Sequence, residues 1–168
     1  MISQDLVKLI IEHADELTNR CLKDIYSREE TRSFKDVPRA IMFDRVRDHY
    51  SKLDAWLAKG TKEGIHNYYI KLGQTRFHEG IPLHELIMAF MLIKRHLWLF
   101  VQEKQFYDSA YALNQAIELN NRVVLFFDRI IYAITIGYEN EIHAQVSALD
   151  SSLFGRVFKR KAAASPAI

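Results

Sequence analysis

The sequence predicts an all-α protein of about five to seven helices around one core, ending in a long helix. Two observations predict this class. The 168 residues include only 6 Gly and 3 Pro, which are few breaks for a chain of this length. Between those breaks, apolar residues recur at the spacing of one helix face. A chain of this size can bury a core of its own as one domain.

The first predicted helix covers about residues 4 to 27, and a polar loop, SREETRSFKD, follows it. The second begins near Val37, with Asp36 as its cap and Pro38 in its first turn, and continues to about residue 57. After the break AKGTKEG, the third helix covers about residues 62 to 79. Gly80 follows it, and we expect this glycine to take the left-handed conformation that ends many helices.

The fourth helix opens with Pro82 and continues to about residue 103. It is apolar on nearly every face, which is typical of a helix at the centre of a bundle. A short turn, EKQFYD, leads to Asp108, which can cap the fifth helix. The β-branched cluster at 123–136 would also suit a strand, but no partner strand is visible, so a helix is expected.

The fifth helix runs from about residue 109 to at least residue 147 with no Pro and one glycine, Gly137. Its apolar residues are spaced close to a heptad, which favours a helix that pairs with a second copy and carries a signal. The residues predicted for this dimer and signal helix are Leu113, Ile117, Val124, Ile131, Ile134, Tyr138 and Ile142.

Charge divides the chain into a predicted helical sensory domain, residues 1–150, and a basic C-terminal tail or linker, residues 151–168. The formal charge is +2, and the last thirteen residues hold four basic residues and no acidic one. The rest holds 19 basic and 21 acidic residues. Such a short basic segment does not indicate nucleic-acid binding, so we expect no nucleic-acid partner.

Cysteine content and hydropathy predict a cytoplasmic protein. The single Cys21 excludes an intrachain disulfide and a cysteine zinc site, and its place on an apolar helical stripe indicates a buried structural thiol. The N-terminus lacks the pattern of a signal peptide. The most apolar run, VVLFFDRIIYAITIGY, is interrupted by Asp128 and Arg129 and is too short to cross a bilayer. We therefore expect no membrane association.

No set of residues typical of catalysis is present, so we do not expect an enzyme. A single Glu-x-x-His, formed by Glu63 and His66, falls short of the paired motifs of a di-iron bundle, and no metal is expected. Zincin, P-loop and nucleophile-elbow motifs are absent from the sequence. The many aromatic residues leave room for an apolar small-molecule pocket, lined by Phe90, Trp98, Phe126 and Phe127.

The segment YYIKLGQTRFHEGIPLHELIMAFMLIKRHLWLF, residues 68–100, resembles the N-terminal domain of the RsbR/RsbRD (RsbT co-antagonist) family. The likeness lies in Leu-Gly, then Arg, then Gly-Ile-Pro-Leu, then Glu-Leu, before an apolar helix with Trp. It implies a globin-like, homodimeric sensory domain in the regulation of a stress response, acting without haem. It also implies that a downstream signalling domain or a separate regulatory protein receives the signal.

The same segment resembles, more weakly, the haem-binding globin-coupled sensors, whose proximal histidine follows an Ile-Gly pair. Arg76 stands at that position here, and a guanidinium cannot ligate iron. A haem-binding oxygen sensor would therefore need His78, His84 or His96 as an unconventional ligand, and this class stays open as an alternative. A binding protein for an apolar small molecule is the second alternative.

Five residues are candidates for contact with a ligand or partner: Arg76, His78, His84, His96 and Trp98. Arg76 fits either a surface or capping charge near a helix end or an anchor for an anionic group. We expect His78 and His84 to be solvated near the corner, and His96 to be partly buried and hydrogen-bonded. The favoured function is a non-enzymatic sensory or regulatory domain with a dimeric long helix.

Overall fold

A computed structural model describes the backbone of residues 2–57, 62–104 and 109–163, and the side chains of residues 4–57, 63–104 and 109–149. Within these ranges the chain is helical and contains no strand, which confirms the predicted all-α class. The elements in order are α1 (Ile2–Glu12), α2 (Ala14–Ser27), η1 (Glu29–Asp36), α3 (Arg39–Ser51), α4 (Leu53–Leu57), α5 (Lys62–His78), α6 (Leu83–Glu103) and α7 (Ala110–Ala163).

The first two predicted helices are each divided in two. His13 separates α1 from α2, and Lys52 separates α3 from α4, although neither site has Gly or Pro to mark the break. The first break lets α1 contact α7 while α2 packs along α3 and α6. Packing against different neighbours has therefore overridden the local helical pattern.

The segment predicted as a polar loop forms the 3₁₀ helix η1. The prediction that Asp36 caps the next helix is wrong. Asp36 is the last residue of η1, whose final turn closes when Val37 N–H donates to Phe34 O at 3.1 Å. Pro38 then occupies the N-cap position of α3, and no side chain caps that helix. The φ of −53° at Pro38 is close to that of a helix, so proline suits a helix start.

Two hydrogen bonds, one local and one long-range, hold η1 on the body. The buried Thr31 hydroxyl donates to Ile25 O at 2.6 Å. The Ser33 N–H donates to Glu85 Oε2 at 2.7 Å, and Glu85 is a buried carboxylate in the first turn of α6. A buried carboxylate needs such a donor, so this contact fixes the position of η1 against α6.

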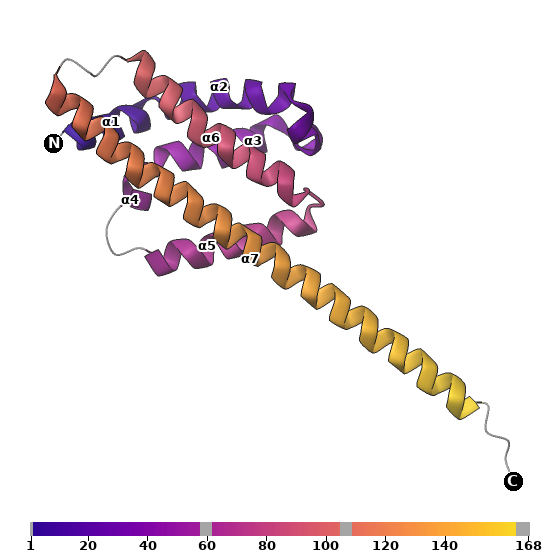
Figure 1. Cartoon of the computed structure of the whole chain (residues 1–168). Coiled ribbons are helices and arrows are strands. Elements are labelled where there is room, and N and C mark those ends of the chain that lie inside the picture. Colours follow the sequence, from indigo (N-terminus) through magenta and orange to yellow (C-terminus); the bar gives the residue numbers. More distant parts are fainter. Residues whose placement is uncertain (1, 58–61, 105–108, 164–168) are drawn as a thin grey trace, which may run out of the picture.

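Helix α6 lies at the centre of the bundle, as predicted. It contacts α1, α2, α3, α7 and η1 (Figure 1). Not all of its apolar residues are covered, since Met91 and Leu99 are exposed. Its buried face consists mainly of Leu86, Ala89, Phe90, Leu92, Ile93, Leu97, Phe100 and Val101.

Helix α7 crosses α5 and then continues alone away from the body (Figure 1). Residues 123–136, which could have formed a strand, lie within this helix as predicted. The predicted boundary at residue 150 also lies within α7, so the backbone is continuous into the basic segment as far as Ala163. Asp108 lies outside the described residues, and Ser109 Oγ accepts the N–H of Ala112 at 3.1 Å near the start of α7.

Cys21 is fully buried, which confirms its predicted structural place. Burial raises the pKa of its thiol to about 12, so the thiol stays protonated and unreactive at neutral pH. In the described part of the chain, no helix has the length and apolar character needed to cross a membrane.

Candidate functional site

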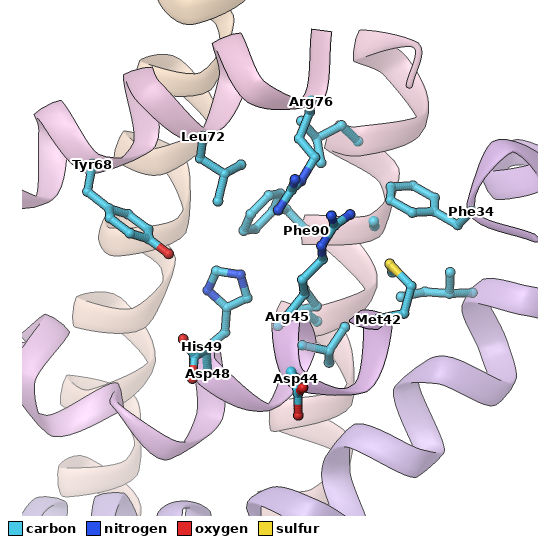
Figure 2. A pocket seen from close by; sticks show the side chains of 15 residues that line it. Phe34, Met42, Asp44, Arg45, Asp48, His49, Tyr68, Leu72, Arg76 and Phe90 are labelled. Carbon is cyan, nitrogen blue, oxygen red and sulfur yellow. The ribbon is translucent and has the colours of Figure 1, made fainter. Parts of the chain in front are cut away.

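A cavity of about 220 Å³ lies between α3, α5 and α6, in the half of the body away from the start of α7. Figure 2 shows side chains from these helices around it, with Phe34 of η1 at one side. Most of the lining is apolar, and the charged and polar lining residues are Asp44, Arg45, Asp48, His49, Tyr68 and Arg76. Among the lining residues that matter below are Met42, Arg45, His49, Leu72, Arg76, Ala89 and Phe90.

Two arginines from different helices meet at this cavity. Arg45 of α3 and Arg76 of α5 extend toward one another (Figure 2). Both bind the carboxylate of Glu79: Arg45 Nη2 and Nη1 contact its two oxygens at 2.8 and 3.0 Å, and Arg76 Nη1 contacts Oε1 at 2.7 Å. Only 13% of the Arg76 side chain and 25% of the Arg45 side chain are exposed.

The electrostatics of this trio favour a second anion. Burial, and then the neighbouring Arg45, lower the pKa of Arg76, against the opposing effect of Glu79. Glu79 is the hydrogen-bond partner of both guanidiniums among the described residues, so two positive charges share one negative charge. Each guanidinium has five N–H donors, and most of them remain available.

His49 lies deep in the same cavity as a neutral base. Its Nδ1 is 3.1 Å from the hydroxyl of Tyr69, and its ring meets Phe90 edge-on at 4.9 Å between centroids. Burial lowers the pKa of His49 from 6.5 to about 4. At neutral pH the imidazole therefore adds hydrogen-bonding capacity to the cavity but no charge.

The Gly-Ile-Pro corner ends α5 beside this trio. Gly80 has φ of 75°, its N–H donates to Phe77 O at 2.9 Å, and the N–H of Ile81 donates to Arg76 O at 3.2 Å. This pair of bonds is a Schellman motif, and it confirms the predicted role of Gly80. Pro82 then takes the N-cap position of α6, one residue before the helix begins.

The corner is also fastened to α7. The buried Tyr138 hydroxyl donates to Ile81 O at 2.7 Å, and the Tyr138 ring meets Phe77 edge-on at 5.7 Å between centroids. His78 Nε2 lies 2.9 Å from Glu141 Oε2 on the next turn of α7. The Arg–Glu trio therefore lies close in sequence to Phe77, His78 and Ile81, which contact α7.

The five predicted candidates do not form one site. Arg76 alone lines the cavity. His78 is exposed beside α7, and His84 is exposed near the start of α6. His96 Nε2 lies 3.0 Å from Asp24 Oδ2, which confirms that His96 is partly buried and hydrogen-bonded. Trp98 is half-buried, and its Nε1 is buried without a partner among the described residues.

The four aromatic residues predicted to line an apolar pocket are also dispersed. Phe90 lines the cavity described above, and Phe126 lines a second, wider groove of about 680 Å³ between α4, α5 and α7. Trp98 and Phe127 line neither of these two spaces. Phe127 lies instead in the hydrophobic core, and Trp98 packs against that core.

The predicted dimer and signal residues divide into three groups on α7 according to their exposure. Ile134 and Tyr138 lie in the core of this chain, facing α5 and the corner, and are not available to a second copy. Val124 and Ile131 are half-buried. The exposed members are Leu113, Ile117 and Ile142.

Three residues of the site, Arg45, His49 and Glu79, were not among the predicted candidates. Arg45 and His49 are four residues apart on α3, and this spacing predicts that they lie on the same face of the helix. No local sequence signal indicates which helix packs against that face. Glu79 follows Arg76 by three residues at the end of α5, which is a spacing typical of a helical ion pair.

The chain is thus an all-α body with a cavity between three of its helices and a long projecting helix. The model of the family described as RsbT co-antagonist protein rsbRD N-terminal domain matches residues 14–153. The chain belongs to this family, as its sequence resemblance implied. It is a family of regulatory co-antagonist domains and not a known enzyme family. None of the curated proteins compared with the chain matches it, and none of the solved structures does.

The cavity between α3, α5 and α6 is too small for a haem. None of the three histidines predicted as alternative haem ligands, His78, His84 and His96, lines this cavity. A cavity of about 150 Å³ holds benzene, so one of about 220 Å³ holds about nine non-hydrogen atoms. That is far less than the four linked rings of a porphyrin.

Proposed function

We propose that this chain is a non-enzymatic sensory domain that acts without haem and passes a change in its helical body to a second copy through α7. Family membership supports the regulatory role. The observation that carries the proposed mechanism is the apolar surface of α7 beyond the body. There Ile142, Val146 and Leu149 are 48%, 51% and 62% exposed.

The spacing of these three residues, four and then three, is that of the a and d positions of a coiled coil. An isolated helix with such a stripe leaves apolar surface in water, and pairing with the same stripe of a second copy would bury it. The exposed Leu125 and Tyr132, seven residues apart, extend apolar surface back along α7 toward the body. This apolar surface supports pairing of α7 with a second copy of the helix.

The domain would act on a partner through this helix pair. The family name describes its members as RsbT co-antagonists. We therefore infer that the output of this chain reaches an RsbT-like regulator or a signalling domain that follows α7. The tie between the α5–α6 corner and α7 through Tyr138 supplies a route from the body to that output.

Light scattering of the purified chain, coupled to size exclusion, tests the pairing. We expect a dimer at micromolar concentration, and we expect Val146→Glu with Leu149→Glu to give a folded monomer. The matched control is Met91→Glu, which places a charge on an equally exposed apolar position of α6. A wild-type monomer at high micromolar concentration, or a dimer unaffected by the two α7 substitutions, would contradict the proposal.

A further inference from the structure

The cavity between α3, α5 and α6 combines an apolar interior with a cationic side. Phe90, Leu72 and Met42 are apolar lining residues, and the guanidiniums of Arg45 and Arg76 extend between Leu72 and Met42 (Figure 2). Because the two guanidiniums come from different helices and are mostly buried, their donors are held in place by the fold. An apolar space with a few convergent polar groups is the usual form of a small-molecule site.

The charges around the cavity leave an excess of positive charge at the arginines. Glu79 neutralises one of the two guanidiniums. Two other carboxylates line the cavity, but Asp48 is bound to Lys52 Nζ at 2.6 Å, and the carboxylate of Asp44 is exposed and points away from the arginines (Figure 2). His49 is neutral at neutral pH. An anion with an apolar body therefore matches both parts of the cavity.

We propose that this cavity binds a small carboxylic acid anion, with its carboxylate on Arg76 and Arg45 and its alkyl or aryl body against Phe90, Leu72 and Met42. Guanidiniums bind carboxylates through paired, charge-assisted hydrogen bonds, which makes a carboxylate a better partner than an alcohol of the same shape. The volume limits the buried part to about nine non-hydrogen atoms, as in a medium-chain or phenyl-substituted acid.

Glu79 occupies the position that the ligand would contest. Its carboxylate already binds both guanidiniums, so it is an internal competitor for the same donors. It also precedes Gly80 at the corner that Tyr138 fastens to α7. Displacement of Glu79 by a ligand would therefore alter the corner. This regulatory consequence rests on the proposed function, but the binding step does not.

Calorimetric titration of the full chain tests the binding. The probe is octanoate, with octanol as the uncharged analogue and acetate as the carboxylate without an apolar body. We expect saturable binding of one octanoate per chain, with both analogues about tenfold weaker or more, the size expected for loss of a charged hydrogen bond or of the buried body. Equal binding of octanol and octanoate, or no saturable binding of octanoate, would overturn the proposal.

Substitutions at the arginines and at Glu79 are expected to act in opposite directions. Arg76→Met keeps an apolar stem and should weaken octanoate binding about tenfold or more. Glu79→Gln removes the competing charge and should strengthen it. Arg47→Met is the matched control, since Arg47 lies on α3 but does not line the cavity, and it should leave the affinity unchanged. If Arg76→Met and Arg47→Met bind octanoate equally, the assignment of the site is wrong.

Methyl signals of methionine locate the ligand in the unmodified protein, which keeps the test decisive if a variant does not fold. Met42 lines the cavity, whereas Met91 is exposed on α6. Octanoate should shift the Met42 methyl resonance and leave that of Met91 in place. Ala89→Leu, which fills part of the cavity, should reduce the shift of the Met42 resonance. A shift confined to Met91 would place the ligand elsewhere.

The oligomeric state of the same samples separates the two proposals. A dimer that binds no octanoate would remove the ligand proposal and leave the proposed pairing of α7 intact. A monomer that binds octanoate through Arg76 would do the reverse.

Discussion

Gly73 of α5 and Gly137 of α7 face each other where the two helices cross. A Cβ atom built on Gly137 would lie 3.2 Å from the Cα of Gly73 and would overlap the carbonyl oxygen of Ile70. One built on Gly73 would overlap the carbonyl oxygen of Ile134. The two backbones are therefore in direct contact, and only glycine permits this approach. Arg76 follows Gly73 by one turn, so the crossing joins the cavity to α7.

Gly137→Ala should therefore destabilise the protein. Alanine is favoured over glycine by about 1 kcal/mol within a helix. The overlap with Ile70 is with rigid backbone, so the helices must separate, at a cost of about 1–3 kcal/mol for overpacking. We expect the second effect to equal or exceed the first, with a net loss of up to about 2 kcal/mol in the free energy of unfolding, measured by urea denaturation.

Gly64→Ala is the control for this substitution. Gly64 lies on the same helix as Gly73, is exposed, and has no atom near the position of a Cβ. Only the gain in helix propensity applies there, so this variant should be more stable than the wild type by up to about 1 kcal/mol. If Gly137→Ala were stabilised as much as Gly64→Ala, the close crossing of α5 and α7 would be refuted.

Features governed by neighbouring residues could be predicted from the sequence. The end of α5 at Gly80 and the start of α6 after Pro82 follow from local backbone rules, and they agree with the structure to within one residue. The burial of Cys21 followed from its place on an apolar stripe. The helical class followed in the same way from periodicity and from the small number of breaks.

Features that depend on long-range contacts could not be predicted. Arg45 and Glu79 are 34 residues apart, and no periodicity indicates that their helices meet. The sequence predicts Arg76 as a possible anion anchor, but it does not predict that Arg45 binds Glu79 beside it. The contact of Gly73 with Gly137 is of the same kind, because its glycines have a role only once α5 and α7 are paired.

His49 should make the stability of the protein depend on pH. Its pKa is about 4 in the folded state against 6.5 ordinarily, so between these values the unfolded chain binds the proton and the folded chain does not. Stability contributed by the neutral imidazole is thus present above pH 6.5 and decreases as the pH falls toward about 4, by about 3 kcal/mol. Urea denaturation at intervals across this range measures the change.

His49→Gln isolates this contribution, because glutamine keeps a polar group beside Tyr69 but does not titrate. As the pH falls from 7 to 4, the free energy of unfolding of the wild type should decrease relative to that of His49→Gln. His84→Gln, at an exposed position, should follow the wild type. Parallel curves for the wild type and His49→Gln would show that His49 is not a buried neutral base.

Haemin should not bind this domain stoichiometrically. The reason is local: Arg76 stands where the proximal histidine would be, and the cavity beside it is too small for a porphyrin. The absorption spectrum of the purified chain, before and after addition of haemin, should lack a sharp Soret band. A stoichiometric Soret band that disappears in His78→Ala, His84→Ala or His96→Ala would instead identify a haem sensor with an unconventional ligand.

Tyr138→Phe should loosen the corner from α7 without disturbing the core. The substitution removes one hydroxyl, which donates to Ile81 O at 2.7 Å, and keeps the ring that packs on Phe77. Loss of a buried hydrogen bond that leaves the acceptor without its donor costs about 1–3 kcal/mol, whereas Tyr132→Phe, at an exposed position of α7, should cost nothing measurable.

Hydrogen exchange at the amides of Gly80 and Ile81 should accelerate in Tyr138→Phe alone, because both amides close the Schellman turn beside this bond. Unchanged exchange there, together with unchanged stability, would mean that Tyr138 does not couple the corner to α7, and the route from the cavity to the long helix would have to pass through the glycine crossing instead.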